Sequence, residues 1–277
     1  MYASDSIVII PTYNEKENIE KIIRAVFGLE KCFHILVIDD GSPDGTAAIV
    51  KGMMAQQEFS DRLFILERSG KLGLGTAYIT GFKWALEHDY GYIFEMDADF
   101  SHDPNDLPRL YSACADEGYD VAIGSRYVSG VNVVNWPIGR VLMSYFASKY
   151  VRFVTGFKVH DTTAGFKCYK RRVLKTIELD KIRFKGYGFQ IEMKFTAYKI
   201  GFKIKEVPVI SSTAARVSRK CRAASLAKHS SVSCGCAGTG GRGNTPRFRN
   251  NCDNQRPLPL YDLRGDFYYW SGFSTNP

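Results

Sequence analysis

Short apolar runs alternate with amphipathic stretches along the first part of the chain, and this alternation most constrains the fold. The apolar runs have the length of strands and cover residues 6–10, 34–38, 63–66 and 92–96. Apolar residues at helical spacing predict helices between these runs, over Glu17–Leu29, Ala47–Gln57 and Ala77–Glu87. Continuous apolar runs are typical of strands that are covered on both faces. The sequence therefore predicts an α/β fold, an open and mostly parallel sheet with flanking helices and right-handed crossovers.

A polar motif follows each of the predicted strands. These motifs are Pro11–Glu15, Asp39-Asp40, Lys71–Thr76 and Asp97–Asp99. Taken singly, each has a structural interpretation, because Asp, Gly and Pro form turns and a lone Lys is usually a solvated charge. Ligands of open α/β sheets bind at the carboxyl ends of the strands, where all these motifs fall. Together they predict a binding site at this edge.

Asp97 and Asp99 follow a buried apolar run and are one residue apart. On an extended backbone, residues at i and i+2 point to the same side. Two carboxylates so close repel each other unless a cation lies between them, and hard oxygen donors suit Mg²⁺ or Mn²⁺. Such ions also bind substrate phosphates, so a diphosphate is the expected ligand. The alternative to a metal and diphosphate site is a solvated strand end with two turn-forming Asp residues.

Charge and cysteine content limit the classes of partner and compartment. The net charge of +8 comes almost entirely from residues 211–277, which leaves 27 Lys and Arg against 26 Asp and Glu in residues 1–210. A neutral body gives no support for nucleic-acid binding. The 7 Cys lack paired spacing and no secretory leader precedes the first strand, which indicates a reducing cytosol. No apolar run reaches the length of a membrane span.

The four polar motifs at the ends of the predicted strands, in this order, resemble those of the GT-A glycosyltransferases. The resemblance is strongest to the dolichol-phosphate (polyprenol-phosphate) mannosyltransferase family. The resemblance covers about residues 5–210. It implies that the nucleoside of GDP-mannose is held by Pro11, Tyr13, Glu15, Ile38 and Asp40. It also implies that Asp97, Ala98 and Asp99 hold the diphosphate and its metal, Mg²⁺ or Mn²⁺. Where many members of the family carry a further Gln ligand, this chain has Ser101.

A second part of the predicted site is the side on which the family binds the acceptor of the sugar, a lipid phosphate. It begins at Arg126, which follows the apolar run Val121–Ser125. The resemblance puts Arg126 in the active site, and a guanidinium suits a phosphate oxygen; the alternative is an ordinary surface Arg. We expect Arg140 to help position the acceptor phosphate. A helix predicted over Val141–Phe153 either faces the core or lies on a membrane surface.

Two further motifs complete the match to the family. The segment Asp161–Lys167 resembles the acceptor-side loop of the family. A helix is predicted over Gln190–Ile200, on which Glu192 either supports the site or lies on the helix surface, and a last strand is predicted over Lys203–Ile210.

The expected function is inverting transfer of a hexose, most simply mannose from GDP-mannose, to a polyprenyl (dolichyl) phosphate. The protein is expected to lie peripherally on the cytoplasmic face of a membrane. One alternative is a transferase acting on a saccharide hydroxyl, which needs a carboxylate base such as Asp161. Another is an inactive nucleotide-sugar-binding protein.

The chain changes in character after Ile210. Residues 1–210 form the predicted GT-A domain. Residues 211–277 are predicted to be a disordered tail, because residues 211–250 are rich in Ser, Ala, Gly, Arg and Cys and have almost no apolar periodicity. The family pattern of an Arg, a Ser-Lys pair and an apolar helix is missing from this tail. Codons for residues from Ser211 onward can be chosen so that the neighbouring frame encodes all three. Our hypothesis is that one nucleotide was lost near codon 211.

Overall fold

The computed structural model of the chain describes residues 4–184 and 186–212. Its strands are β1 (Ser6–Thr12), β2 (His34–Asp39), β3 (Leu63–Glu67), β4 (Tyr92–Glu95), β5 (Val121–Ser125), β6 (Val133–Val134), β7 (Lys167–Lys170), β8 (Ile204–Pro208) and β9 (Ser211–Ser212). Its α-helices are α1 (Ile19–Phe27), α2 (Thr46–Met54), α3 (Leu74–Glu87), α4 (Leu107–Ala115), α5 (Ile138–Thr155), α6 (Arg171–Thr176) and α7 (Tyr187–Ile200). Two 3₁₀ turns, η1 (Pro104–Asp106) and η2 (Leu179–Lys181), complete the elements of this part of the chain.

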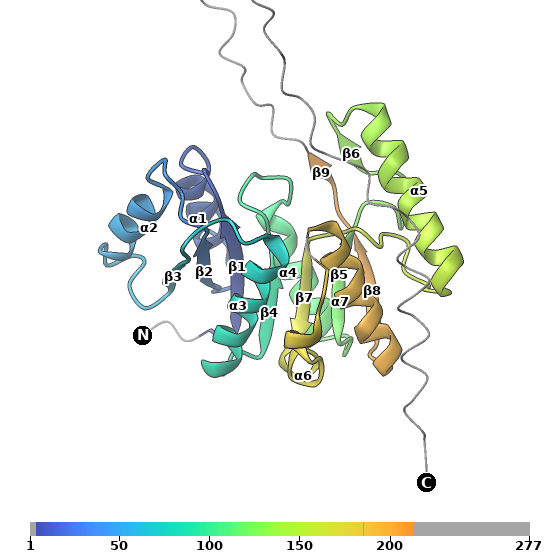
Figure 1. Cartoon of the computed structure of the whole chain (residues 1–277). Helices are drawn as coiled ribbons and strands as arrows, with labels where there is room; N and C mark the ends of the chain where they lie inside the picture. Colours follow the sequence, from blue (N-terminus) through green and yellow to red (C-terminus); the bar gives the residue numbers. More distant parts are fainter. Residues whose placement is uncertain (1–3, 185, 213–277) are drawn as a thin grey trace, which may run out of the picture. The chain divides into compact units, whose positions relative to one another are not determined.

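A 7-stranded sheet with the order β3-β2-β1-β4-β7-β5-β8 forms the centre of the fold (Figure 1). All neighbouring strands run parallel except β7, which is antiparallel to both β4 and β5. The mostly parallel α/β sheet predicted from the sequence is therefore confirmed. The sequence analysis did not predict β7, α4 or α6.

Helices cover both faces of the sheet because the strand residues alternate between two cores. Val8 and Ile10 of β1 pack in one core with α1, α2 and α4. Ile7 and Ile9 pack in the other core with α3, α6 and α7. Both cores consist of fully buried aliphatic and aromatic side chains, so burial of apolar surface on two faces holds the layers together.

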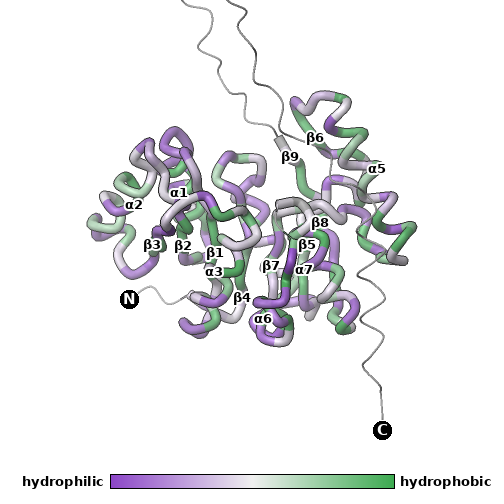
Figure 2. Tube along the Cα trace, viewed as in Figure 1, coloured by the Kyte–Doolittle hydropathy of each residue, from purple (hydrophilic) through white to green (hydrophobic). Residues whose placement is uncertain are grey.

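Helix α5 lies beside the β8 end of the sheet, apart from the helices of the two layers (Figure 1). Ser148 and Val151 are its buried residues, whereas Ile138, Met143 and Phe153 are 80%, 76% and 89% exposed. The interpretation of this segment as a core-facing helix is therefore wrong. Hydrophobic stretches remain visible along α5 in Figure 2. No helix in the described ranges is long and apolar enough to cross a membrane.

Candidate functional site

The carboxyl ends of β1 and β2 lie at one level, because Thr12 is paired with Asp39 and Pro11 with Ile38. The buried Asp39 carboxylate accepts hydrogen bonds from Thr12 Oγ1 (2.9 Å) and from Ser42 N and Oγ (2.9 and 2.6 Å). Asp39 thus closes the turn after β2. Its neighbour Asp40 makes different contacts, and its predicted binding of the nucleoside stays a prediction.

Asp40 is held by Arg68, which the sequence analysis did not single out. Arg68 Nη2 and Nε lie 2.6 and 2.7 Å from Asp40 Oδ1. The same guanidinium donates to Thr76 Oγ1 (2.9 Å) and to the carbonyl of Gly73 (3.4 Å). Arg68 therefore joins two motifs that the sequence predicted to share one edge, the Asp39-Asp40 turn and the Lys71–Thr76 loop.

The other residues predicted to hold a nucleoside differ in accessibility. Tyr13 is 38% exposed, and Lys71 Nζ lies 4.7 Å from the centre of its ring. Glu15 Oε2 accepts a hydrogen bond from Asn18 Nδ2 (2.9 Å), and Pro11 is partly buried at the end of β1. Ile38 is fully buried in the α3 core, so it supports the edge from below and does not line it.

Asp97, Ala98 and Asp99 follow β4, but the strand ends at Glu95 and residues 98–99 form a turn. The extended backbone assumed for residues 97–99 is therefore absent at residues 98–99, and the placement of both carboxylates on one side stays a prediction. The Asp99 carboxylate accepts the N–H of Ser101 (2.9 Å), and Ala98 is buried.

Two aromatic residues orient Asp97. Tyr78 of α3 donates its hydroxyl to Asp97 Oδ1 (3.1 Å), and burial first, then the charge of Asp97, raises the pKa of Tyr78 and keeps it protonated. The Asp97 N–H donates to Nδ1 of His102 (3.0 Å), whose Nε2 lies 3.8 Å from Asp97 Oδ2. Burial lowers the pKa of His102, in keeping with a neutral ring that accepts at Nδ1.

The carboxylate ligands at the Asp97–Asp99 turn fit a metal ion that a substrate also coordinates. Within residues 4–184 and 186–212, no group of three or more His, Cys, Asp or Glu side chains is arranged to hold a metal ion. Asp97 and Asp99 supply hard carboxylate oxygens, which suit Mg²⁺ or Mn²⁺ when diphosphate and water complete the coordination. The residues present therefore fit such an ion only together with a diphosphate.

Below this turn lies a buried charge pair that the sequence analysis missed. Lys167 Nζ of β7 lies 3.0 Å from Glu95 Oε2 of β4, and both side chains are fully buried. Lys167 also donates to Gln190 of α7. The sequence analysis assigned Lys167 to the acceptor-side loop; it is instead a strand residue that joins β4, β7 and α7.

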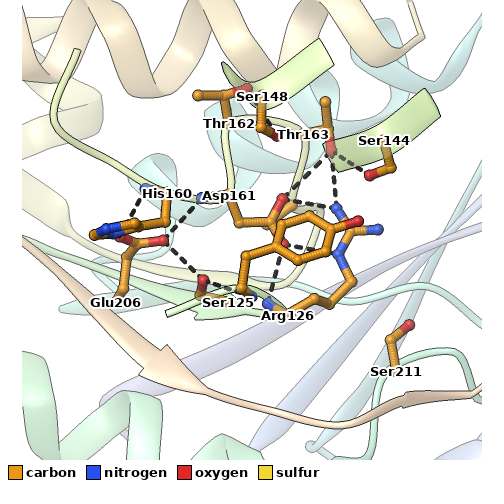
Figure 3. Close-up of polar contacts among 12 residues, drawn as sticks. Ser125, Arg126, Ser144, Ser148, His160, Asp161, Thr162, Thr163, Glu206 and Ser211 are labelled. Carbon is orange, nitrogen blue, oxygen red and sulfur yellow. Dashed lines mark hydrogen bonds and ion pairs between the residues drawn. The ribbon is translucent and has the colours of Figure 1, made fainter. Parts of the chain in front are cut away.

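Arg126 follows β5 and is clamped by Asp161 (Figure 3). Its Nε and Nη2 donate to the two Asp161 carboxylate oxygens at 2.7 Å each, its N–H donates at 3.0 Å, and Nη2 also reaches Thr163 Oγ1 at 2.8 Å. Burial alone would raise the pKa of Asp161, but the hydrogen bonds and charge of Arg126 outweigh it and lower that pKa. The interpretation of Arg126 as an ordinary surface residue is therefore wrong, since its side chain is only 13% exposed.

An indole connects Arg126 to Arg140. The guanidinium carbons of Arg126 and Arg140 lie 5.2 and 4.0 Å from the centre of the Trp136 ring. Arg140 is exposed, and in the part of the chain that the structure describes it forms no ion pair. The two predicted arginines thus share one aromatic surface, with Arg126 neutralised by Asp161 and Arg140 presented to solvent.

His102 joins the two halves of the site. One side of its ring contacts Asp97, and its face stacks on Phe166, with ring centres 4.9 Å apart and an interplanar angle of 8°. Phe166 lies in the acceptor-side loop, directly before β7, so the carboxylate turn and the loop that carries Asp161 are in contact. Glu192, in contrast, accepts the N–H groups of Arg183 and Phe184 (3.1 and 3.0 Å) and therefore holds the segment before α7.

Comparison with known proteins gives consistent matches. A family model described as glycosyl transferase family 2 matches residues 7–178. Polyprenol monophosphomannose synthase of Mycolicibacterium smegmatis is 47% identical over 204 residues, which cover 74% of this chain and 76% of that protein. Undecaprenyl-phosphate mannosyltransferase of Micrococcus luteus is 42% identical over 203 residues, which cover 73% of this chain and 82% of that protein.

Two solved structures share the fold at low sequence identity. Mannosyltransferase PcManGT from Pyrobaculum calidifontis, in complex with GDP-Man and Mn²⁺, has a TM-score of 0.52 at 17% identity, and the match covers 79% of this chain but 59% of that one. Glucosyl-3-phosphoglycerate synthase from Mycobacterium tuberculosis, in complex with Mn²⁺, UDP and glucosyl-3-phosphoglycerate, has a TM-score of 0.55 at 20% identity, and the match covers 74% of this chain and 70% of that one. At these identities the two structures establish the fold alone.

Proposed function

Because this chain belongs to glycosyl transferase family 2 and, within it, to the polyprenol-phosphate mannosyltransferases, we propose that it transfers mannose from GDP-mannose to a polyprenyl phosphate, with inversion at the sugar. The names of the relatives with 47% and 42% identity support this substrate pair. The observation that carries the proposal is the contact of His102 with both Asp97 and Phe166, since it brings a carboxylate turn against the acceptor-side loop whose Asp161 holds Arg126.

For the donor, we propose that Asp40, Tyr13, Glu15 and Pro11 bind the nucleoside and that the turn at Asp97–Asp99 binds the diphosphate through Mg²⁺ or Mn²⁺. Such an ion, when bound, offsets the charge that builds on the departing diphosphate. The Mn²⁺ in the two solved relatives supports a divalent ion. Tyr78 and His102 serve this function by holding Asp97 in one orientation.

For the acceptor, we propose that Arg126 and Arg140 bind the lipid phosphate. A phosphate monoester carries close to two negative charges near neutral pH, since its second pKa is about 6. It is therefore already a nucleophile and needs positioning more than it needs a general base. Arg126 offers a fixed guanidinium, and the exposed Arg140 offers one that can move to the ligand.

The alternative of a saccharide hydroxyl as acceptor required a base, for which Asp161 was the candidate. Asp161 is fully buried, both of its carboxylate oxygens bind Arg126, and its pKa is lowered. A low pKa and the lack of access to solvent make it a poor base. This geometry favours a lipid phosphate as the acceptor.

We also propose that α5 attaches the protein peripherally to the cytoplasmic face of a membrane. Its exposed side includes Met143, Phe146 and Phe153, with Lys149 and Arg152 on the same helix. Apolar side chains with neighbouring basic ones suit the interface of an anionic bilayer. The acceptor phosphate of a lipid would lie at that depth, close to Arg140 in the first turn of the helix.

A donor and acceptor screen tests the proposed function. The protein is incubated with GDP-mannose or another nucleotide sugar, with Mn²⁺, and with either a polyprenyl phosphate or an oligosaccharide, and products are identified by mass. A mannosyl-phosphoryl lipid formed from GDP-mannose is the expected product. Mannose on the oligosaccharide would support the first alternative, and GDP-mannose binding without turnover would support an inactive binding protein.

A further inference from the structure

The loop that clamps Arg126 is itself held from two sides by a carboxylate and an amine that lie beyond the region matched by the family model. We propose that Glu206 of β8 and Lys194 of α7 are positioning residues for acceptor binding: they fix the main chain of Asp161 so that its carboxylate orders Arg126. The inference rests on the proposed function of Arg126 as a ligand of the lipid phosphate. It assigns roles to two residues outside residues 7–178.

Glu206 ties the end of β5 to the start of the acceptor-side loop (Figure 3). Its Oε1 accepts from Ser125 Oγ (2.7 Å) and from Asp161 N (2.9 Å). Its Oε2 accepts from the N–H and Nδ1 of His160 (2.8 Å each). The Glu206 side chain is 9% exposed, so these donors replace the water that a carboxylate otherwise requires.

Lys194 holds the same loop from the helix side. Its Nζ donates to the carbonyls of Asp161 (3.2 Å) and Ala164 (2.8 Å), and the side chain is fully buried. In the described ranges it forms no ion pair with a carboxylate, and burial lowers its pKa well below the ordinary value. Burying an amine without a counter-charge costs free energy, and here the two loop carbonyls are what it binds.

Together the two residues hydrogen-bond both main-chain polar groups of Asp161. Glu206 binds its N–H and Lys194 binds its C=O, while the side chain makes the bidentate contact with Arg126. A guanidinium held in one geometry loses less entropy on binding a phosphate than a mobile one does. The positions of Glu206 and Lys194 therefore contribute to acceptor affinity although neither side chain contacts the acceptor.

The opposite end of the β5–β8 pair offers a matched control. Asp120 is 2% exposed, accepts the N–H of Lys203 (3.0 Å), and binds the guanidinium of Arg172 (2.6 Å from Nε). It thus repeats the chemistry of a buried carboxylate, a backbone N–H and an arginine, at the end of the strands away from Arg126. Replacing Asp120 removes comparable contacts without touching the acceptor-side loop.

The experiment compares the full chain with its Glu206→Gln, Lys194→Met and Asp120→Asn variants. Farnesyl phosphate and GDP with Mn²⁺ are titrated separately by calorimetry, and the side-chain Nε–H NMR signal of Arg126, assigned with Arg126→Lys, is followed. We expect Glu206→Gln and Lys194→Met each to weaken farnesyl phosphate binding by about tenfold or more and to broaden the Arg126 signal. GDP affinity should stay within about twofold, and Asp120→Asn should leave both affinities and the signal unchanged.

Unchanged farnesyl phosphate affinity in either folded variant of the loop contacts, or an equal loss in Asp120→Asn, would overturn the inference. The two variants act on different atoms of Asp161, so one of them still tests the inference if the other fails to fold. Failure of the proposed function looks different: the unmodified chain would bind no farnesyl phosphate, while the Arg126 signal would still broaden in both variants.

Discussion

Asp97 and Asp99 are the residues on which the proposed donor chemistry depends. We predict that Asp97→Asn and Asp99→Asn each lower turnover by roughly a hundredfold or more, because an amide is a weaker ligand for a divalent ion than a carboxylate. Steady-state rates measured against Mn²⁺ concentration test this, with thermal unfolding as the control for folding. Full activity in EDTA, or of both variants, would show that the metal assignment is wrong.

The ion pair of Asp161 with Arg126 gives a prediction for the pH dependence of stability. Because the pKa of Asp161 is lowered in the folded state, its contribution is complete above the ordinary Asp pKa of about 3.9 and is lost as pH falls through the lower folded value. Breaking a buried pair on one side typically costs about 3–5 kcal/mol. We therefore expect Asp161→Asn to unfold at a lower urea concentration than the unmodified chain. The difference in free energy of unfolding between the two proteins should be constant between about pH 5 and 7 and should narrow below about pH 4.

An exposed pair supplies the control for this measurement. Asp89 binds Arg171 at 2.7 Å, and the Asp89 side chain is 90% exposed. Asp89→Asn should change the free energy of unfolding by less than about 1 kcal/mol. If the difference in free energy of unfolding between Asp161→Asn and the unmodified chain stayed constant down to pH 3, the lowered pKa of Asp161 would be contradicted.

At the level of the elements, the sequence predicted the strands and helices whose pattern is apolar. Strands β1 to β3 and helix α3 match their predicted positions within a few residues, because β1 and β2 are buried on both faces and Leu63 to Leu66 of β3 form a short apolar run. Strand β7 was missed because Lys167 and Lys170 make it look like a solvated loop. Lys167 is buried only because Glu95 lies opposite it in the antiparallel register, a partner from a distant part of the chain.

The candidate site could be predicted from the sequence only in part. Motifs at the carboxyl ends of parallel strands must converge, so the meeting of the Asp40 turn with the Lys71–Thr76 loop followed from topology. Arg68, His102 and Glu206 were missed because each acts through a partner that the fold supplies. Of these three residues, His102 is the one that the sequence alone could have indicated, because it follows Asp97 and Asp99 closely in the chain.

Helix α5 carries a prediction of its own. Liposome flotation should recover the protein with anionic vesicles more than with neutral ones, because Arg140, Lys149 and Arg152 add roughly 1 kcal/mol each near an anionic surface. Phe146→Ser and Phe153→Ser should each weaken binding by about tenfold, as expected for removing a large apolar side chain from the interface. Ile200→Ser on α7, which is 43% exposed, is the matched control and should bind as the unmodified chain does. No flotation with either lipid would contradict the proposal.

At the level of the whole molecule, the stacking of His102 on Phe166 joins the carboxylate turn to the acceptor-side loop, the two segments to which we assign donor and acceptor binding. The sheet places the two halves at neighbouring strand ends, since β7 lies between β4 and β5. The antiparallel strand thus brings the acceptor-side loop back to the carboxylate turn, which a purely parallel arrangement would carry away. Cys32, Cys114 and Cys168 are free, so none of this arrangement depends on a disulfide that involves them.

The division of the chain at Ile210 remains a proposal, because residues 213–277 lie outside the described residues. Within the described part, contacts continue past Ile210: β9 pairs with β6, and Ser211 Oγ donates to the carbonyl of Ser101 (3.1 Å). The packed domain therefore reaches slightly beyond the boundary predicted from composition.

The frame hypothesis gives the last prediction. If one nucleotide was lost near codon 211, a chain with the restored frame regains an Arg and a Ser-Lys pair that the family places near the substrate phosphates. Charged phosphate contacts of this kind contribute a few kcal/mol to binding of the transition state, so the restored chain should turn over roughly a hundredfold faster or more. Limited proteolysis of the present chain should leave a stable core that ends near Ile210. Gene sequencing comes first, and an intact frame would overturn the hypothesis. A protease-resistant tail together with undiminished turnover of the present chain would mean that residues 211–277 are a genuine part of the enzyme.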